Sequence, residues 1–168
     1  MRSHLFKALL LSIFVSSNGF AELNEAINAY QNQDLKKATQ LFKKASDDIQ
    51  AKIYLARIYM RSDLDDAEDW IEDAVKQDNK NAEAHYVRGR VMGQQASASF
   101  LSALSYAKKS KKSFERAVEL KPTSVEFQTG LFRFHTNATY CRRRHPHEQH
   151  RHCADPAAVQ QGIPGIQS

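Results

Sequence analysis

Apolar side chains recur at intervals of three and four between residues 22 and 135, and proline is absent from this stretch except at Pro122. Such spacing gathers apolar side chains on one face of a helix, and the strong helix formers Ala, Leu, Lys, Gln and Glu dominate the stretch. Two successive faces, Ile53–Tyr59 and Ala67–Val75, flank Asp63–Asp66, whose residues suit a helix cap and a tight turn. The pattern therefore predicts helices joined in hairpins.

A short unit occurs three times along this stretch. It consists of a small residue, a bulky residue four positions later, and a second small residue three positions after that. Small residues let the second helix of a hairpin approach the first, and the bulky residue fills the space between them. The three copies are Ala38, Phe42 and Ala45; Ala67, Ile71 and Ala74; and Ser110, Phe114 and Ala117.

These units resemble the second helix of the tetratricopeptide repeat (TPR) family. The resemblance covers roughly Leu23 to His135 and implies an all-α solenoid of three TPR-like helical hairpins and a partial fourth, which begins at Val125. The flanking segments that strengthen it are Asp34–Ala38 and Asp63–Ala67, which resemble the turn of the repeat, Ala82–Gly89, which resembles its first helix, and Glu119–Pro122, which resembles its end.

The spacing of the repeats is irregular. Ala45 and Ala74 are 29 residues apart, and Ala74 and Ala117 are 43 apart, whereas the family period is about 34. The third repeat has its extra residues within Gly93–Lys109, so we expect one long helix over Ser99–Leu120. The side chains that we expect on its buried side are Phe100, Leu104, Ala107, Phe114 and Val118.

The first residues have the features of a secretory signal. Arg2 and Lys7 give a positively charged start before an apolar run, Ala8–Val15, and Gly19–Ala21 ends in small residues at the two positions that a signal peptidase inspects. The run is far shorter than the roughly 20 residues of a spanning helix, and no cysteine follows it to carry a lipid. We therefore expect residues 1–21 to be removed and the product to be periplasmic or secreted, with no transmembrane segment remaining.

The net charge of +5 arises mainly at the two ends of the chain. Between Glu22 and Ala138 there are 18 basic and 17 acidic residues. The body is therefore nearly neutral, which removes the main argument for a nucleic-acid partner. Four lysines at positions 108, 109, 111 and 112 are flanked by serine. We expect them to form a solvated face, rather than a site for an anionic membrane or a nucleic acid.

A candidate binding site appears when the first helices of the repeats are aligned. Arg57, Arg90 and Arg133 then share the ninth position, which in the TPR family faces the concave groove. A guanidinium forms paired hydrogen bonds with a carboxylate, so the groove is predicted to bind another protein through an acidic segment or a C-terminal carboxylate. The alternative is that these arginines are solvated or paired with Asp63–Asp73. The less charged companions in the predicted groove are Tyr30, Ile53, Met60 and Tyr86.

The composition changes after Ala138. Residues 139–168 contain both cysteines, three of the four prolines and a run of histidines, and the helical pattern stops. We expect a disordered tail, so that the helical domain spans residues 22–138. A reading-frame slip would explain why Val125–His135 has no second helix after it, because codon choices exist in which a one-base shift restores a Gly-Gly-Asp turn.

The alternative for this tail is a metal site. Cys and His are ligands that hold Zn, Ni or Cu, although their spacing here matches no recognisable zinc finger. The two cysteines could instead form a disulfide in an oxidising compartment. The candidate ligands are Cys141, His145, His147, His150, His152 and Cys153.

Sequence motifs give no support for catalysis. The chain has no glycine-rich phosphate loop, no Gly-x-Ser-x-Gly elbow and no His-Glu-x-x-His, and its helical body contains no cysteine nucleophile. We therefore expect an interaction module without enzymatic activity or a cofactor. His85 and His135 are expected to pack in the core or to lie at a solvated edge.

Overall fold

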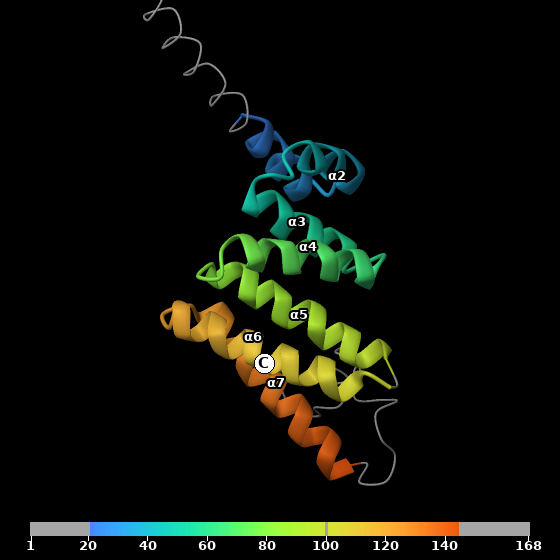
Figure 1. Cartoon of the computed structure of the whole chain (residues 1–168), viewed down its shortest axis with the longest axis vertical. Helices are drawn as coiled ribbons and strands as arrows, with labels where there is room; N and C mark the ends of the chain where they lie inside the picture. The colour runs from blue at the N-terminus through green and yellow to red at the C-terminus, as the bar shows by residue number, and fades with distance from the viewer. Residues whose placement is uncertain (1–20, 100, 145–168) are drawn as a thin grey trace, which may run out of the picture. The chain divides into compact units, whose positions relative to one another are not determined.

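The regular elements in the described part of the chain are all helices. The computed structural model describes residues 21–99 and 101–144, with side chains as far as residue 136. These residues divide into two compact units, one ending at Gln77 and the other beginning at Asp78. A helix over residues 21–31 is followed by α2 (Leu35–Lys44), α3 (Ile49–Tyr59), α4 (Leu64–Gln77), α5 (Ala82–Ala98), α6 (Ala103–Leu120) and α7 (Val125–Arg144) (Figure 1).

Short acidic and amide side chains set the starts of the helices. Asp34, Asp48, Asp63 and Asn81 each precede a helix, and a side-chain oxygen of each accepts a hydrogen bond from a backbone N–H of the first turn. These bonds satisfy donors that have no partner within the helix. The cap predicted within Asp63–Asp66 is thereby confirmed.

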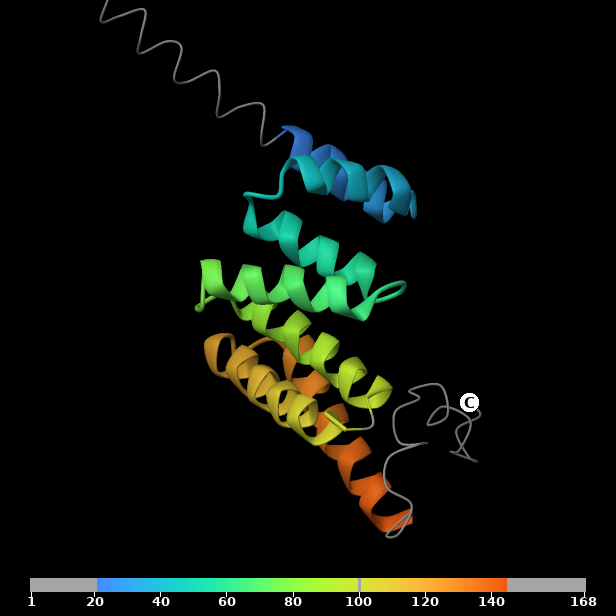
Figure 2. The same ribbon diagram turned by 45° about the vertical axis from the view of Figure 1, so that its right-hand side comes forward.

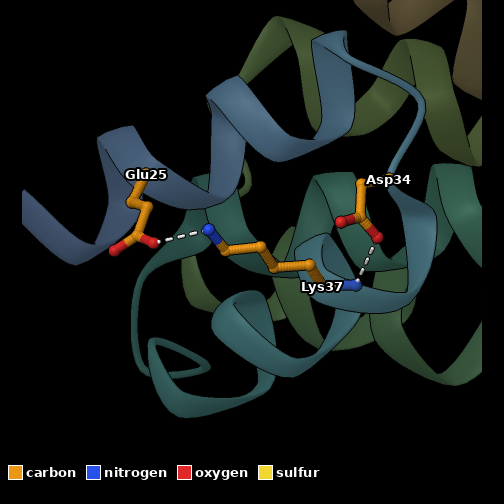
Figure 3. A network of polar contacts seen from close by, with 3 residues as sticks. All are labelled: Glu25, Asp34 and Lys37. Carbon is orange, nitrogen blue, oxygen red and sulfur yellow. Dashed lines mark hydrogen bonds and ion pairs between the residues drawn. The ribbon is translucent and has the colours of Figure 1, made fainter.

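The turn before α2 is held by polar contacts. Gln33 adopts a left-handed backbone with φ 62°, and the Asp34 N–H donates to the Ala29 carbonyl at 3.0 Å. Figure 3 shows that Asp34 accepts from the Lys37 backbone N–H, while the Lys37 ammonium lies 2.9 Å from a Glu25 carboxylate oxygen. That ion pair joins α2 to the preceding helix.

The core of the first unit lies between its helices. The Phe42 ring of α2 stacks on the Tyr54 ring of α3, with centroids 4.9 Å apart, and the rings of Tyr54 and Tyr30 meet edge to face with centroids 5.0 Å apart. Small residues let these helices approach, as the repeated unit predicted. The buried residues of this cluster are Ala26, Ala29, Ala38, Phe42, Ala51, Leu55 and Ile58, and α4 buries Ala67, Ile71 and Ala74.

The second unit contains the pair α5–α6 and the helix α7. Its centre is aromatic: the Tyr86 ring of α5 meets Phe114 of α6 at 5.7 Å and stacks on Phe127 of α7 at 4.8 Å. Two glycines make room for these rings. A Cβ at Gly89 would lie 2.8 Å from the Phe114 ring, and one at Gly130 would lie 2.6 Å from the Tyr86 ring.

The prediction of one long helix over Ser99–Leu120 is wrong at its start. α5 continues to Ala98, a break follows, and α6 begins at Ala103, so both helices of this hairpin take up the extra residues. Leu104, predicted to be buried, is 65% exposed, because it lies about 100° around the helix from Ala103, which faces α5. Phe100 is outside the described residues. The residues of α6 that are buried are Ala103, Ser110, Ser113, Phe114 and Ala117.

The last described helix crosses the predicted domain boundary at Ala138. The backbone of α7 remains helical through Arg144, so the first residues of the segment expected to be disordered are in a helix. The remainder of that segment, residues 145–168, lies outside the described residues, as do residues 1–20. Among the helices that are described, none is long and apolar enough to cross a membrane.

Candidate partner-binding face

In the first unit, Arg57 lies beside an aromatic pair. Its guanidinium carbon is 5.5 Å from the centroid of the Tyr54 ring, which also contacts Tyr30. All three side chains are partly exposed, as is Met60 at the end of α3. A guanidinium over a ring face is attracted by the ring quadrupole and still presents donors along its edge. This group can therefore hold a carboxylate or an aromatic side chain.

In the second unit, Arg90 and Arg133 are exposed on α5 and α7. Arg90 follows Tyr86 by one turn, and Arg133 follows Gly130 by one turn. Tyr86 packs closely on Gly130, and α5 and α7 run in the same general direction (Figures 1 and 2). Arg90 and Arg133 therefore each lie one turn on the C-terminal side of the contact between Tyr86 and Gly130.

The three predicted arginines belong to two units. Arg57 lies in the first unit, and Arg90 and Arg133 lie in the second. The structure gives each an exposed or partly exposed position on a first helix of a hairpin. A continuous row of all three remains a prediction.

Two of the predicted companions are corrected by their burial. Ile53 is fully buried and Tyr86 is 9% exposed, so neither presents an appreciable surface to a partner. The ring of Tyr86 is used for packing against Phe114 and Phe127. The alignment of the repeats gave the position of each residue along its helix. It did not show that a large side chain at such a position can pack against the neighbouring helices, as Tyr86 does.

Tyr54 was missed by the sequence analysis. It precedes Arg57 by three residues, which places the two side chains on the same helix face. An aromatic residue three positions before an arginine was the available signal.

His85 is a packing residue, which is one of the two roles expected of it. It is 7% exposed, and because a carbonyl can only accept, its Nε2–H donates to the Asn79 carbonyl at 2.9 Å. Its Nδ1 is buried and has no hydrogen-bond partner among the described residues. Burial lowers the pKa of His85 below 6.5, and the nearby charges of Arg88 and Arg116 lower it further, against the opposing effects of the Asn79 carbonyl and Asp78. The histidine therefore favours its neutral form.

The predicted metal site falls almost entirely beyond the described chain. Cys141 lies in the last turns of α7, where only the backbone is described. The other five candidate ligands, His145, His147, His150, His152 and Cys153, are outside the described residues. Within residues 21–99 and 101–136, no group of three or more His, Cys, Asp or Glu side chains could hold a metal ion.

No family model matches the sequence, and no curated protein matches it. Solved structures do. The first TPR domain of Spaghetti (RPAP3), bound to the HSP90 peptide SRMEEVD, has a TM-score of 0.60 at 19% identity, over 74% of this chain and 95% of that one. The first TPR domain of human RPAP3 gives 0.61 at 18%, over 75% and 96%. The Arabidopsis OM64 TPR domain gives 0.58 at 18%, over 71% and 96%. The chain thus has the TPR fold.

Proposed function

We propose that this chain, which has the fold of TPR domains, is a protein-interaction module that binds an extended segment of another protein along its first helices. The observation that carries the proposal is the fold likeness to a TPR domain solved with the peptide SRMEEVD bound. Three of the last four residues of that peptide carry a carboxylate. TPR domains present the first helices of their hairpins to such segments.

The arginines give the proposal its chemistry. Arg90 and Arg133 are exposed on first helices, and Arg57 is held over the Tyr54 ring. A guanidinium donates two parallel hydrogen bonds to one carboxylate, which is stronger than a neutral hydrogen bond. The preferred partner segment is therefore acidic or ends in a free carboxylate.

A peptide selection followed by affinity measurement tests this function. A library of peptides with free C termini is selected on the protein, and enriched peptides are labelled for fluorescence polarisation. We expect enrichment of acidic residues near the C terminus. Replacing Arg90 or Arg133 by Ala should weaken binding about tenfold or more, because a hydrogen bond to a charged group contributes roughly 1.5–3 kcal/mol.

The matched control is Lys112→Ala, which removes an exposed cation from α6, a second helix of the same unit. Its affinity should match that of the original protein. Failure to enrich any peptide, or equal losses for the arginine variants and for Lys112→Ala, would contradict the proposed site.

Export of the chain is a separate part of this proposal. The charged start, the short apolar run and the small residues before Glu22 support cleavage by a signal peptidase and a periplasmic or secreted location.

A further inference from the structure

The third hairpin has an uneven distribution of charge. No acidic residue occurs between Glu83 and Glu115, whereas this stretch contains two arginines and four lysines. The four lysines lie on α6 within a little more than one turn, and all are exposed: Lys108, Lys109, Lys111 and Lys112. In a helical body whose charges nearly balance overall, this concentrates positive charge on the third hairpin, most of it on α6.

Two large apolar side chains lie next to the start of the same helix, Leu101 just before it and Leu104 in its first turn. Leu101 is 93% exposed and Leu104 is 65% exposed. Leu104, Lys108 and Lys111 are spaced by four and three residues, which places them along one face of α6. Two exposed leucines next to a cluster of like charges make this surface a candidate for binding. We name this surface the tip patch; its residues are Leu101, Leu104, Lys108, Lys111 and Lys112.

The tip patch runs from Leu101, just before α6, to Lys112 in the middle of that helix, and it belongs to the hairpin whose helices are longest among the described pairs. α5 and α6 have 17 and 18 residues, whereas α3 and α4 have 11 and 14. Packing of α6 on α5 uses a different line of residues, from Ala103 to Ala117. The outward line is therefore not required by the fold. The last residues of α5 and the first residues of α6 lie at the same end of this hairpin (Figure 2).

Most of the charge on the tip patch is available to a ligand. Lys111 lies 3.6 Å from Glu115, a half-exposed contact that water screens. Within the described residues, Lys108 and Lys112 form no ion pair. Lys109, beside the patch, lies over the ring of Tyr106 at 5.3 Å. The partner must therefore carry several negative charges and also an apolar region that can contact the two leucines.

We propose that the tip patch docks on the surface of an anionic phospholipid bilayer. Leu101 and Leu104 enter the boundary between headgroups and acyl chains, and the lysines contact lipid phosphates. A nucleic acid fits less well, because single strands stack on aromatic side chains and leave leucines without apolar contact. The lysines were expected to be an ordinary solvated face because serine flanks them, and the exposure of Leu104 beside them changes that interpretation. This surface is distinct from the first helices that hold the protein partner.

Vesicle flotation tests the proposal. The chain starting at Glu22 is used, because the signal segment would itself bind lipid, and this chain keeps every buried residue of the described core, of which Ala26 is the first. It is mixed with vesicles of phosphatidylcholine alone, or of phosphatidylcholine and phosphatidylglycerol in equal parts. We expect binding only to the mixed vesicles, weakening as salt increases.

Two variants separate the contributions of charge and apolar contact. The triple variant Lys108→Gln, Lys111→Gln and Lys112→Gln should lose about a hundredfold in affinity, since each lysine near an anionic surface contributes roughly a factor of five. The double variant Leu101→Ser and Leu104→Ser should also bind more weakly and lose the binding that persists at high salt. The matched control is Lys36→Gln, Lys44→Gln and Lys80→Gln, which changes the net charge equally at exposed positions elsewhere. It should retain most of the affinity.

Four outcomes would overturn the proposal. The first is no flotation with mixed vesicles. The second is equal losses in the two lysine variants, which would mean that net charge alone drives binding. The third is no loss in the leucine variant. The fourth is tight binding of single-stranded RNA that competes fully with the vesicles. Circular dichroism of each variant confirms that it is folded, which we expect because all substituted side chains are exposed.

Discussion

Two glycines of α5 differ in what faces them. A Cβ at Gly89 would lie 2.8 Å from the Phe114 ring, whereas one at Gly93 would meet only the Ser110 hydroxyl at 3.4 Å. Both substitutions by Ala gain the same helix propensity, about 1 kcal/mol. Gly89→Ala must also displace a buried ring, which costs about 1–3 kcal/mol. We expect urea denaturation to show that Gly93→Ala is more stable than Gly89→Ala by about that amount, and equal stabilities would contradict the tight packing on Phe114.

His85 makes stability depend on pH. Its pKa is lower in the folded chain than the ordinary value of 6.5, mainly because of burial. The unfolded chain therefore binds a proton more readily, so the stabilising contribution is present above about pH 6.5 and is lost as pH falls through the folded pKa. We expect the free energy of unfolding to decrease between about pH 7 and pH 5, and to do so less in His85→Gln. His135→Gln, at an exposed position, is the control and should follow the original protein.

At the scale of an element, the turn before α2 contains a strained residue. Gln33 has φ 62°, where a Cβ costs about 1–2 kcal/mol relative to glycine. Gln33→Gly should therefore stabilise the protein by up to about 1 kcal/mol after the greater freedom of glycine in the unfolded chain is counted. Gln40→Gly, in the middle of α2 and exposed, should instead destabilise it by about 1 kcal/mol. Thermal unfolding measured by circular dichroism distinguishes the two, and destabilisation by both would contradict the left-handed turn.

The helices themselves could be predicted, because apolar spacing and capping residues act locally. The repeated small–bulky–small units identified the buried faces, and eight of their nine residues are buried, the exception being the half-buried Ala45. The break between α5 and α6 could not be predicted from Gly93–Lys109. The spacing of apolar residues in this segment is compatible with an extension of α5 as well as with an earlier start of α6. The outward position of Leu104 follows from that break. Local patterns thus located the hairpins, while the ends of the longest one depended on contacts between α5 and α6.

The predicted binding residues fall into two groups, those that are exposed as predicted and those that are buried. Arg57, Arg90 and Arg133 are at least partly exposed on first helices, as a surface role requires. Ile53 and Tyr86 occupy positions on the predicted face but are buried. The position of a residue in a helix gives the direction of its side chain, but it does not tell how closely a neighbouring helix covers that side chain. Tyr54 was recognised through its contacts with Phe42, Tyr30 and Arg57, although its position three residues before Arg57 can be read from the sequence.

At the scale of the whole molecule, the proposed signal cleavage can be separated from folding. The first described helix begins at residue 21, but its first buried residue is Ala26, with Leu23 partly buried before it. Cleavage after Ala21 therefore removes no core side chain. We expect mass spectrometry of the protein exported by a Gram-negative host to show a chain beginning at Glu22.

The same boundary predicts how far the chain can be shortened. A chain beginning at Glu22 should melt at the temperature of a full chain in which cleavage is blocked. A chain beginning at Asn28 loses Leu23, Ala26 and Ile27, which pack on the cluster around Phe42, and it also loses the Glu25 partner of Lys37. Removing buried apolar side chains destabilises a small domain by a few kcal/mol, so this chain should melt at a lower temperature. An intact exported chain would contradict the signal, whereas equal melting of the chain from Asn28 would contradict the packing of the first helix.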